Sequence, residues 1–229
     1  MKQHSKGYDD RAHVARAKPK GPSFDLDNEP SMMVQEQIAR LRFLDEQIGL
    51  KNKSILDLGC GTGFNFEYAV RKLGASKYLG FDISASAIAF AKNAYPDGDF
   101  RLGDICDGDL EVDPASWDIV LNCEVIEHVQ EPGKLLASIK RHMHRDTIAF
   151  ISTPNKPVFS LGYEPSPVNH THIKEFTLDE FRALLKADFE ITKMAGQRFN
   201  DDSQFKIQQA IVARNIKDYK LLGDFYWNI

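Results

Sequence analysis

Short apolar segments and longer segments with helical periodicity alternate along most of this chain. The apolar segments have the length of buried strands, and the segments between them repeat apolar residues every three or four positions, as amphipathic helices do. Strands that alternate with helices form βαβ units, which predict an α/β fold: a mostly parallel sheet with helices on both faces. The predicted strands are residues 53–58, 77–82, 99–102, 117–122, 147–152, 189–194 and 206–214, and the predicted helices are residues 33–48, 64–73, 84–95, 132–142 and 178–185.

The alternation breaks at both ends of the chain and once inside it. Residues 1–30 are polar and have few apolar anchors, which predicts an arm that is either disordered or able to fold over an active site as a lid. Residues 31–229 are expected to form a single domain. Within it, prolines interrupt residues 154–176, and an irregular insertion of this kind is more often functional than structural. Residues 216–229 are an apolar, aromatic tail, which we expect to pack back onto the domain.

The composition favours a folded protein in a reducing compartment. The hydrophobic content is 42% and the formal net charge is -4, so no overall positive field attracts nucleic acid. The three cysteines, Cys60, Cys106 and Cys123, are too widely spaced to suggest a disulfide framework. No apolar run approaches the roughly 20 residues of a membrane span, and none follows Lys2 and Lys6 as in a secretory signal. We therefore predict a cytoplasmic protein.

One strand-to-helix junction, residues 55–63, carries the glycine-rich sequence ILDLGCGTG. Glycines let the backbone turn sharply and approach a ligand closely, and the helix that follows turns its N–H groups toward that ligand. The G-x-G-x-G spacing differs from the G-x-G-x-x-G spacing that fits a pyrophosphate. Asp57, just before the glycines, suits a positively charged group. The motif therefore predicts a ligand with an amino-acid end and no phosphate.

Two more acidic residues follow the next two predicted strands. Asp82 closes the second strand, where a carboxylate can accept both hydroxyls of a ribose. Asp104 follows the third strand and can accept a hydrogen bond from an adenine amino group, while Ile83 and Ile105 could enclose the ring. Carboxyl ends of parallel strands meet at one edge of a sheet, so these carboxylates are expected to converge on a nucleoside. The alternative is a tight turn whose aspartates only cap helices. It would require that acidic residues follow three successive strands by coincidence.

With these motifs, residues 30–215 resemble the class I, seven-stranded S-adenosylmethionine-dependent methyltransferases. The matching segments are ILDLGCGTG, YLGFDIS, FRLGDI and WDIVLNCEVIEHV, the last with Trp117 where the family usually has phenylalanine. The resemblance implies a Rossmann-like sheet of strand order 3-2-1-4-5-7-6 with an antiparallel last strand, and S-adenosyl-L-methionine as cofactor. In the family the glycines line the methionine part, and the segment that ends the fourth strand borders the sulfonium. The implied cofactor-binding residues are Asp57, Gly59, Cys60, Gly61, Gly63, Asp82, Ile83, Asp104, Ile105, Asn122 and Cys123.

Glu124, Glu127 and His128 follow the fourth strand and are the candidate catalytic residues. If this turn is helical, they lie at i, i+3 and i+4 on one face, where two carboxylates and an imidazole can bind a divalent cation. His172 is the first choice for a further metal ligand and His170 the second. Two alternatives to the metal site stay open: His128 acts as a base without metal, or these side chains have no chemical role and the acidic ones only favour a helix dipole.

The acceptor of the methyl group is only partly indicated by the sequence. The E-V-I-E-H block, with a T-P-N and a late H-I-K-E-F-T element, resembles the ubiquinone-biosynthesis-type O-methyltransferases and their small-molecule relatives. The same block with a distant histidine also resembles small-RNA 3′-terminal 2′-O-methyltransferases, but the late element lacks their tryptophan. We therefore predict O-methylation of a small hydroxylated metabolite or sugar, ahead of a small-molecule N-methyltransferase, the RNA enzyme and a non-catalytic S-adenosylmethionine-binding subunit.

The insertion and the oligomeric state complete the expectations. Side chains of the insertion are expected either to contact the acceptor or only to pack within the loop. The predicted partner is the small-molecule acceptor, with no membrane, with nucleic acid disfavoured, and with a monomer or a homodimer both open. The insertion residues considered are Phe159, Tyr163, Glu164 and Asn169.

Overall fold

The computed structural model describes residues 32–107, 110–160, 169–198, 207–213 and 225–228. The chain divides into two compact units, one made of Asp9–Ile105 and the other mainly of Cys106–Ile229. The predicted arm and two of the predicted acceptor contacts, Tyr163 and Glu164, lie outside the described residues. Whether the chain is a single domain stays a prediction.

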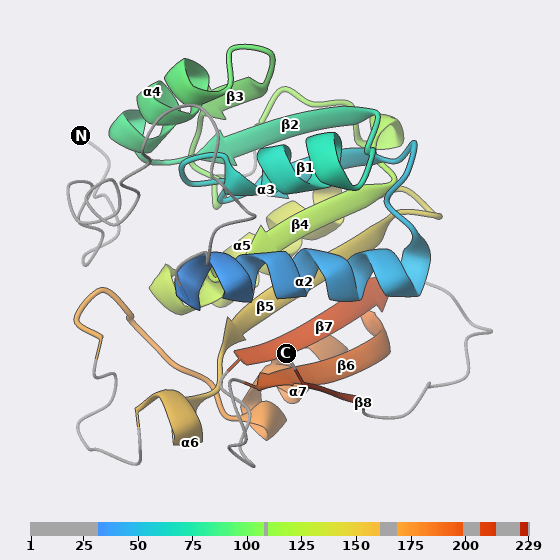
Figure 1. The fold of residues 1–229 in the computed structure, drawn as a ribbon. Helices are drawn as coiled ribbons and strands as arrows, with labels where there is room; N and C mark the ends of the chain where they lie inside the picture. Colours follow the sequence, from blue (N-terminus) through green and yellow to red (C-terminus); the bar gives the residue numbers. More distant parts are fainter. Residues whose placement is uncertain (1–31, 108–109, 161–168, 199–206, 214–224, 229) are drawn as a thin grey trace. The chain divides into compact units, whose positions relative to one another are not determined.

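The first unit is a parallel sheet with helices between its strands, as the alternation predicts (Figure 1). Its strand order is β3-β2-β1, and both strand pairs are parallel. The predicted helix over residues 64–73 starts as an α-helix but continues in π form, where Leu73 N donates to Tyr68 O. The elements of this unit are α2 (Met32–Ile48), β1 (Ser54–Leu58), α3 (Phe64–Phe66), η1 (Glu67–Lys72), β2 (Lys77–Asp82), α4 (Ala85–Ala94) and β3 (Asp99–Leu102).

Local sequence signals explain where these elements begin and end. Gly49 has a positive φ of 67° and terminates α2, as predicted. Ser84 caps α4, because its hydroxyl accepts a hydrogen bond from Ala87 N at 3.0 Å. Gly63 is required for two reasons: its φ is 85°, and a Cβ there would lie 2.9 Å from the ring of Phe100. The glycine turn is therefore fitted tightly onto the aromatic core beneath it.

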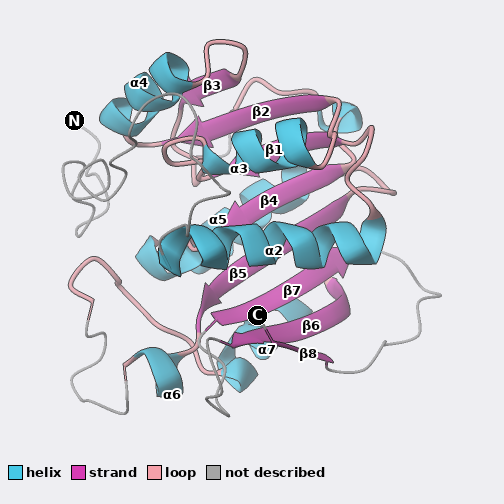
Figure 2. Ribbon diagram, in the orientation of Figure 1, coloured by secondary structure: helices cyan, strands magenta, loops and turns pink. Residues whose placement is uncertain are grey.

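The second unit has a parallel strand pair, an antiparallel hairpin and a last strand that pairs in parallel (Figure 2). β4 and β5 are parallel, β7 is antiparallel to both β5 and β6, and the order is β4-β5-β7-β6-β8. The predicted hairpin is confirmed, and part of the predicted tail pairs with it as β8, parallel to β6. The elements of this unit are η2 (Pro114–Ser116), β4 (Ile119–Cys123), η3 (Ile126–His128), α5 (Pro132–Arg141), β5 (Ile148–Pro154), α6 (Lys156–Phe159), α7 (Leu178–Lys186), β6 (Glu190–Arg198), β7 (Ile207–Ala213) and β8 (Phe225–Asn228).

The strand orders in the two units, β3-β2-β1 and β4-β5-β7-β6, are those that the resemblance implied, so the predicted fold class is confirmed. α7 begins with the predicted capping box: Thr177 Oγ1 accepts from Glu180 N, and the Glu180 carboxylate accepts from Thr177 N.

The base of the insertion is closed by backbone contacts. Asn155 and Phe176 form an isolated parallel bridge, and Lys156 N donates to Phe176 O at 2.9 Å. α6 follows directly, and within the described residues the insertion returns at Asn169. This bridge ties the last residues of the insertion to the end of β5.

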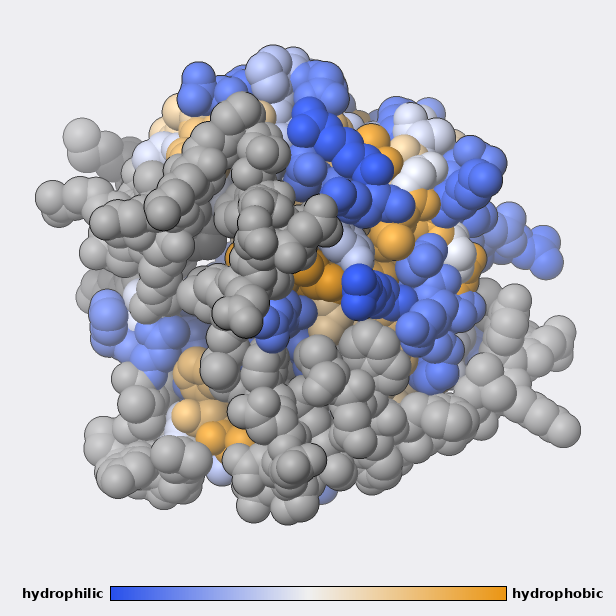
Figure 3. Space-filling model, viewed as in Figure 1, coloured by the Kyte–Doolittle hydropathy of each residue, from blue (hydrophilic) through white to orange (hydrophobic). Residues whose placement is uncertain are grey.

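None of the helices in the described ranges is long and apolar enough to cross a membrane. On the face drawn in Figure 3, the described surface is largely hydrophilic, with smaller hydrophobic areas between the polar side chains.

Candidate active site

The glycine turn in the first unit is held by backbone hydrogen bonds to the end of β2. Gly59, Gly61 and Gly63 have φ angles of 96°, 53° and 85°, which residues other than glycine rarely adopt. Gly59 N and Cys60 N both donate to Phe81 O, at 2.8 and 2.9 Å. These hydrogen bonds attach the start of the turn to the end of β2.

Asp57 lies beneath this turn and is fully buried. Its Oδ2 accepts hydrogen bonds from Tyr78 Oη and from Asn65 Nδ2, whereas its Oδ1 accepts none from the described residues. Burial raises the pKa of Asp57 to about 6; the two hydrogen bonds oppose this rise, and nearby Asp82 adds to it. A buried carboxylate with an unused oxygen fits an ammonium group, which would stabilise its charged form.

Asp82, at the end of β2, binds the glycine turn and the next helix at once. Its Oδ2 accepts from Gly61 N and its Oδ1 from Ser84 N, both at 2.8 Å. Asp82 therefore has a structural role of the kind considered as an alternative, although the residue that caps α4 is Ser84. This role does not exclude ribose binding, because a carboxylate can accept about four hydrogen bonds.

The remaining predicted cofactor contacts follow β2 and β3. Gly103 N donates to Asp82 O at 3.0 Å, which places the segment after β3 beside the end of β2. Asp104 is exposed, Ile105 is buried and Ile83 is half-buried. The structure thus brings the predicted nucleoside contacts of this unit to neighbouring strand ends, and their roles in binding stay predictions.

In the second unit, β4 ends at a strained residue. Asn122 is buried and Cys123 half-buried, and Glu124 follows with a positive φ of 56°. Glu124 N donates to Ser152 O at 3.0 Å, and Ser152 Oγ donates to Glu124 Oε1 at 2.7 Å. The condition for a shared helix face, a helical turn from Glu124, is not met, because the 3-10 turn η3 begins only at Ile126. Glu124 therefore does not share a helix face with the residues that follow it.

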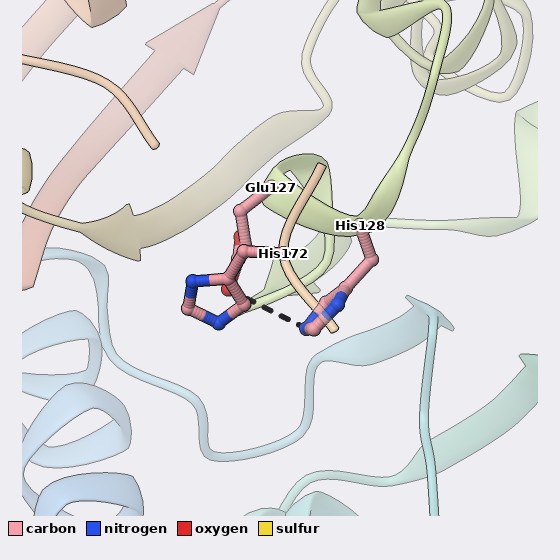
Figure 4. A group of neighbouring side chains, drawn as sticks. All are labelled: Glu127, His128 and His172. Carbon is pink, nitrogen blue, oxygen red and sulfur yellow. Dashed lines mark ion pairs between the residues drawn. The ribbon is translucent and has the colours of Figure 1, made fainter. Parts of the chain in front are cut away.

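Glu127, His128 and His172 do come together, as Figure 4 shows. Their donor atoms lie within 4.8 Å of one another, and His128 Nε2 is 3.9 Å from Glu127 Oε1. Thr153 Oγ1 donates to Glu127 Oε2 at 3.0 Å, and His128 Nδ1 faces Thr171 O at 2.8 Å. His172 is thus the histidine of the insertion that joins the group.

The two other predicted metal ligands are not part of this group. His170 is exposed, and Glu124 is hydrogen-bonded to Ser152 instead.

The residue types of this group suit a divalent metal ion, but their ligand atoms are too far apart to bind one as they stand. Metal-binding histidines usually donate their second ring N–H to a carbonyl or carboxylate, as His128 does to Thr171 O and His172 to Glu175 Oε1. Ligands about 2.1 Å from one ion can be at most about 4.2 Å apart. The donors here spread to 4.8 Å, so an ion would have to draw them together.

Several partners of the group could not be recognised as such from the sequence. Thr153 at the end of β5, the Thr171 carbonyl and Ser160, which donates to Glu175 Oε2, have no motif around them. Glu175 is different, since it lies three residues after His172 in the H-I-K-E-F-T element and its carboxylate is completely buried. An acid three residues after a histidine is a sequence signal that could have been used.

Known proteins support the predicted family. A family profile described as a methyltransferase domain matches residues 34–193. A probable S-adenosylmethionine-dependent methyltransferase of Mycolicibacterium smegmatis is 30% identical over 145 residues, 63% of this chain and 54% of that protein. A ubiquinone biosynthesis O-methyltransferase of Coxiella burnetii is 34% identical over 120 residues, 51% of this chain and 50% of that protein. The chain spans about half the length of these curated relatives.

Solved structures share the fold at lower identity. The magnesium protoporphyrin IX methyltransferase of Synechocystis, crystallised with bound SAH, superposes with a TM-score of 0.64 at 16% identity. The match covers 90% of this chain and 94% of that one. At this identity the likeness shows the fold alone, whereas the family profile covers well over half of the sequence. The chain therefore belongs to the methyltransferase-domain family, among the class I S-adenosylmethionine-dependent methyltransferases.

Proposed function

We propose that this protein binds S-adenosylmethionine and transfers its methyl group to a hydroxyl of a small molecule. The observation that carries the choice of a hydroxyl is the arrangement of His128 with Glu127. Thr171 O can only accept, so His128 Nδ1 carries the proton and Nε2 is the basic nitrogen. An imidazole fixed in this way is suited to remove a proton from an acceptor.

The methyl donor fits the residues of the glycine turn. When bound, it supplies a methyl group on a positively charged sulfur, ready for in-line displacement. The unused Oδ1 of Asp57 would receive its ammonium group, and Asp82 would accept from its ribose hydroxyls. The exposed Asp104 and buried Ile105 would contact the adenine. Binding would thereby stabilise the ionised Asp57 that burial disfavours.

On the acceptor side, His128 would take the hydroxyl proton as the new O–CH3 bond forms. Its side chain is 28% exposed, whereas that of Glu127 is 1% exposed. The buried Glu127 carboxylate would stabilise the imidazolium that results. A neutral amine needs no such base to attack, so this pair favours a hydroxyl over an amine. The O-methyltransferase named among the relatives supports the same choice.

A divalent cation is the second candidate for activating the hydroxyl, because Glu127, His128 and His172 form the one group of potential ligands found among the described residues. Such an ion would lower the pKa of a bound hydroxyl. The test is to assay with a chelator and then add magnesium, manganese or zinc. Activity that survives chelation leaves His128 as the base, and activity that returns with one metal assigns the ion.

The proposed function is tested with the full chain, labelled S-adenosylmethionine and three acceptor probes: catechol, benzylamine and a short RNA. Calorimetry should first show binding of S-adenosylmethionine and its loss in Asp82→Ala. Methyl transfer to catechol oxygen is then expected. Failure of the wild type to bind S-adenosylmethionine contradicts the proposal, and so does transfer to the amine or the RNA but not to catechol. A cytoplasmic location and a monomer or homodimer stay predictions.

A further inference from the structure

The loop of residues 169–175 is bound to the turn that carries His128. Ile173 N and Lys174 N both donate to Glu127 O, at 2.7 and 3.1 Å. Thr171 O accepts from His128 Nδ1, a contact between residues 43 positions apart in the sequence. The loop therefore holds both the backbone and the side chain of this turn.

A chain of hydrogen bonds in the same loop fixes the proton of His172. Thr171 N can only donate, and it faces one amide atom of Asn169 at 3.1 Å, so that atom is Oδ1. Nδ2 of Asn169 then donates to His172 Nε2 at 2.9 Å. His172 must therefore carry its proton on Nδ1, which faces Glu175 Oε1 at 2.8 Å. His172 is a neutral imidazole with both nitrogens engaged.

The two histidines differ in what they can reach. His172 contacts two rings, with centroid distances of 5.2 Å to Phe159 and 4.9 Å to His128, the latter edge to face. Its side chain is 4% exposed, against 28% for His128. The Glu175 that binds it is also buried, and Ser160 donates to the other oxygen of its carboxylate. Only His128 combines a fixed tautomer with access to an acceptor.

We propose that His172 is a positioning residue, which Asn169 and Glu175 hold in place and which acts on the reaction only by orienting His128. The inference rests on the proposed role of His128 as the base. It assigns the two histidines unequal roles, whereas joint coordination of an ion would make both essential.

The first test needs no acceptor and therefore does not depend on the proposed function. Long-range nitrogen–proton NMR of the full chain distinguishes the two neutral tautomers of each histidine. His128 and His172 should both carry the proton on Nδ1 at neutral pH. His172 with its proton on Nε2, or on both nitrogens, would overturn the proposed hydrogen-bond chain even if catechol proves to be an acceptor.

The second test compares single and double variants with catechol as the probe. His128→Ala should lower kcat by about 10³-fold, in the range of a lost general base, and His172→Ala by about tenfold. Because His172 acts through His128, the double variant should be no slower than His128→Ala. Equal losses in the two single variants, or losses that multiply in the double variant, would show an independent role and overturn the proposal.

A variant of equal size, Glu175→Gln, tests the positioning role with less risk of misfolding than the alanine variants. Glu175→Gln should lower kcat about tenfold and leave KM for S-adenosylmethionine unchanged, because a neutral amide holds the Nδ1–H of His172 less firmly than a carboxylate. Glu180→Gln is the matched control, since this carboxylate meets the same loop at the surface, through Lys174 at 3.6 Å. It should leave kcat and both tautomers unchanged. A Glu175→Gln protein with wild-type kcat would refute the positioning role.

Discussion

The glycine turn over Asp57 and the turn that carries His128 differ in how fully their polar groups are hydrogen-bonded within the protein. Asp57 is buried with one oxygen that accepts no hydrogen bond from the described residues, and its pKa is raised to about 6. The histidine turn is bound by its own chain: Thr171 O, Thr153 Oγ1 and two backbone N–H groups hold it. In the glycine turn, the buried charge of Asp57 destabilises the protein until a cation binds beside it. In the histidine turn, the hydrogen bonds are already formed before any ligand binds.

This difference predicts opposite effects on stability when a carboxylate is neutralised. In the glycine turn, removing the charge relieves a desolvation cost. In the histidine turn, removing the charge breaks hydrogen bonds that the fold has already made. Substitutions in both regions should therefore lower activity, but only one of them should also stabilise the unliganded protein.

The largest effect is expected for Asp57→Asn. The pKa of Asp57 rises from 3.8 to about 6, and roughly 1.4 kcal/mol for each unit makes the ionised form cost about 3 kcal/mol at pH 8. The amide keeps an acceptor for Tyr78 and Asn65 but adds a buried N–H, which offsets about 1 kcal/mol. The variant should be about 2 kcal/mol more stable in chemical denaturation at pH 8, and it should lose affinity for S-adenosylmethionine.

The pH dependence of this gain has a definite sign. A raised pKa means that the folded protein binds the proton more tightly, so the contribution of Asp57 is most favourable below pH 3.8 and is lost as the pH rises to about 6. The difference between Asp57→Asn and the wild type should therefore be negative or near zero at pH 4, grow between pH 4 and 6, and stay constant above. A gain that does not depend on pH would point to packing, not charge.

The next effect is expected for Glu127→Gln. Its carboxylate accepts from Thr153 and lies 3.9 Å from His128, in a position where only 1% of the side chain is exposed. Loss of a charge-assisted contact is worth about 1.5–3 kcal/mol, so kcat should fall about 10- to 100-fold with unchanged affinity for S-adenosylmethionine. Stability at pH 8 should fall or stay level. If it rises as in Asp57→Asn, the two regions do not differ as argued above.

The same two regions differ in how far the sequence could predict them. The glycine turn follows from nine consecutive residues, because strand, turn and helix are local and each glycine has a local reason in its positive φ. Asp82 was also predictable, since parallel strands end at a common edge. The π form of η1 could not be predicted, because its hydrogen bonds shift by one residue without any change in the apolar pattern of the sequence.

The histidine turn depends on contacts that no local pattern encodes. His172 could be chosen as a candidate, but its partner Asn169 and the Thr171 carbonyl act through the path of the insertion. The helical turn that would have aligned Glu124 with Glu127 does not form, because Ser152 O accepts from Glu124 N, Ser152 Oγ donates to the Glu124 carboxylate, and Glu124 has a φ of 56°. Such a tertiary contact overrides the spacing of acidic residues along the chain.

A smaller effect separates backbone strain from side-chain chemistry at Glu124. In the left-handed region an alanine costs about 1 kcal/mol more than a glycine, the reverse of their usual order. Glu124→Gly should therefore be about 1 kcal/mol more stable than Glu124→Ala, although both lose the contact with Ser152. Asn52, with a φ of 64°, is the matched control: its glycine and alanine variants should show the same order of stability. Equal stabilities at Glu124 would mean that the backbone there relaxes.

The smallest effect on activity is expected for Thr177→Ala, at the start of α7. The substitution removes both hydrogen bonds of the Thr177 hydroxyl in the capping box and should cost about 1 kcal/mol, which lowers the Tm by about 2–4 °C. Its kcat should stay near that of the wild type. The loop before Thr177 is held separately, by the Asn155–Phe176 bridge and by the Glu127 carbonyl. A large fall in kcat would mean that α7, and not these contacts, keeps the loop on the histidine turn. The hydrogen bonds of the turn would then not be enough to hold it in place before ligands bind.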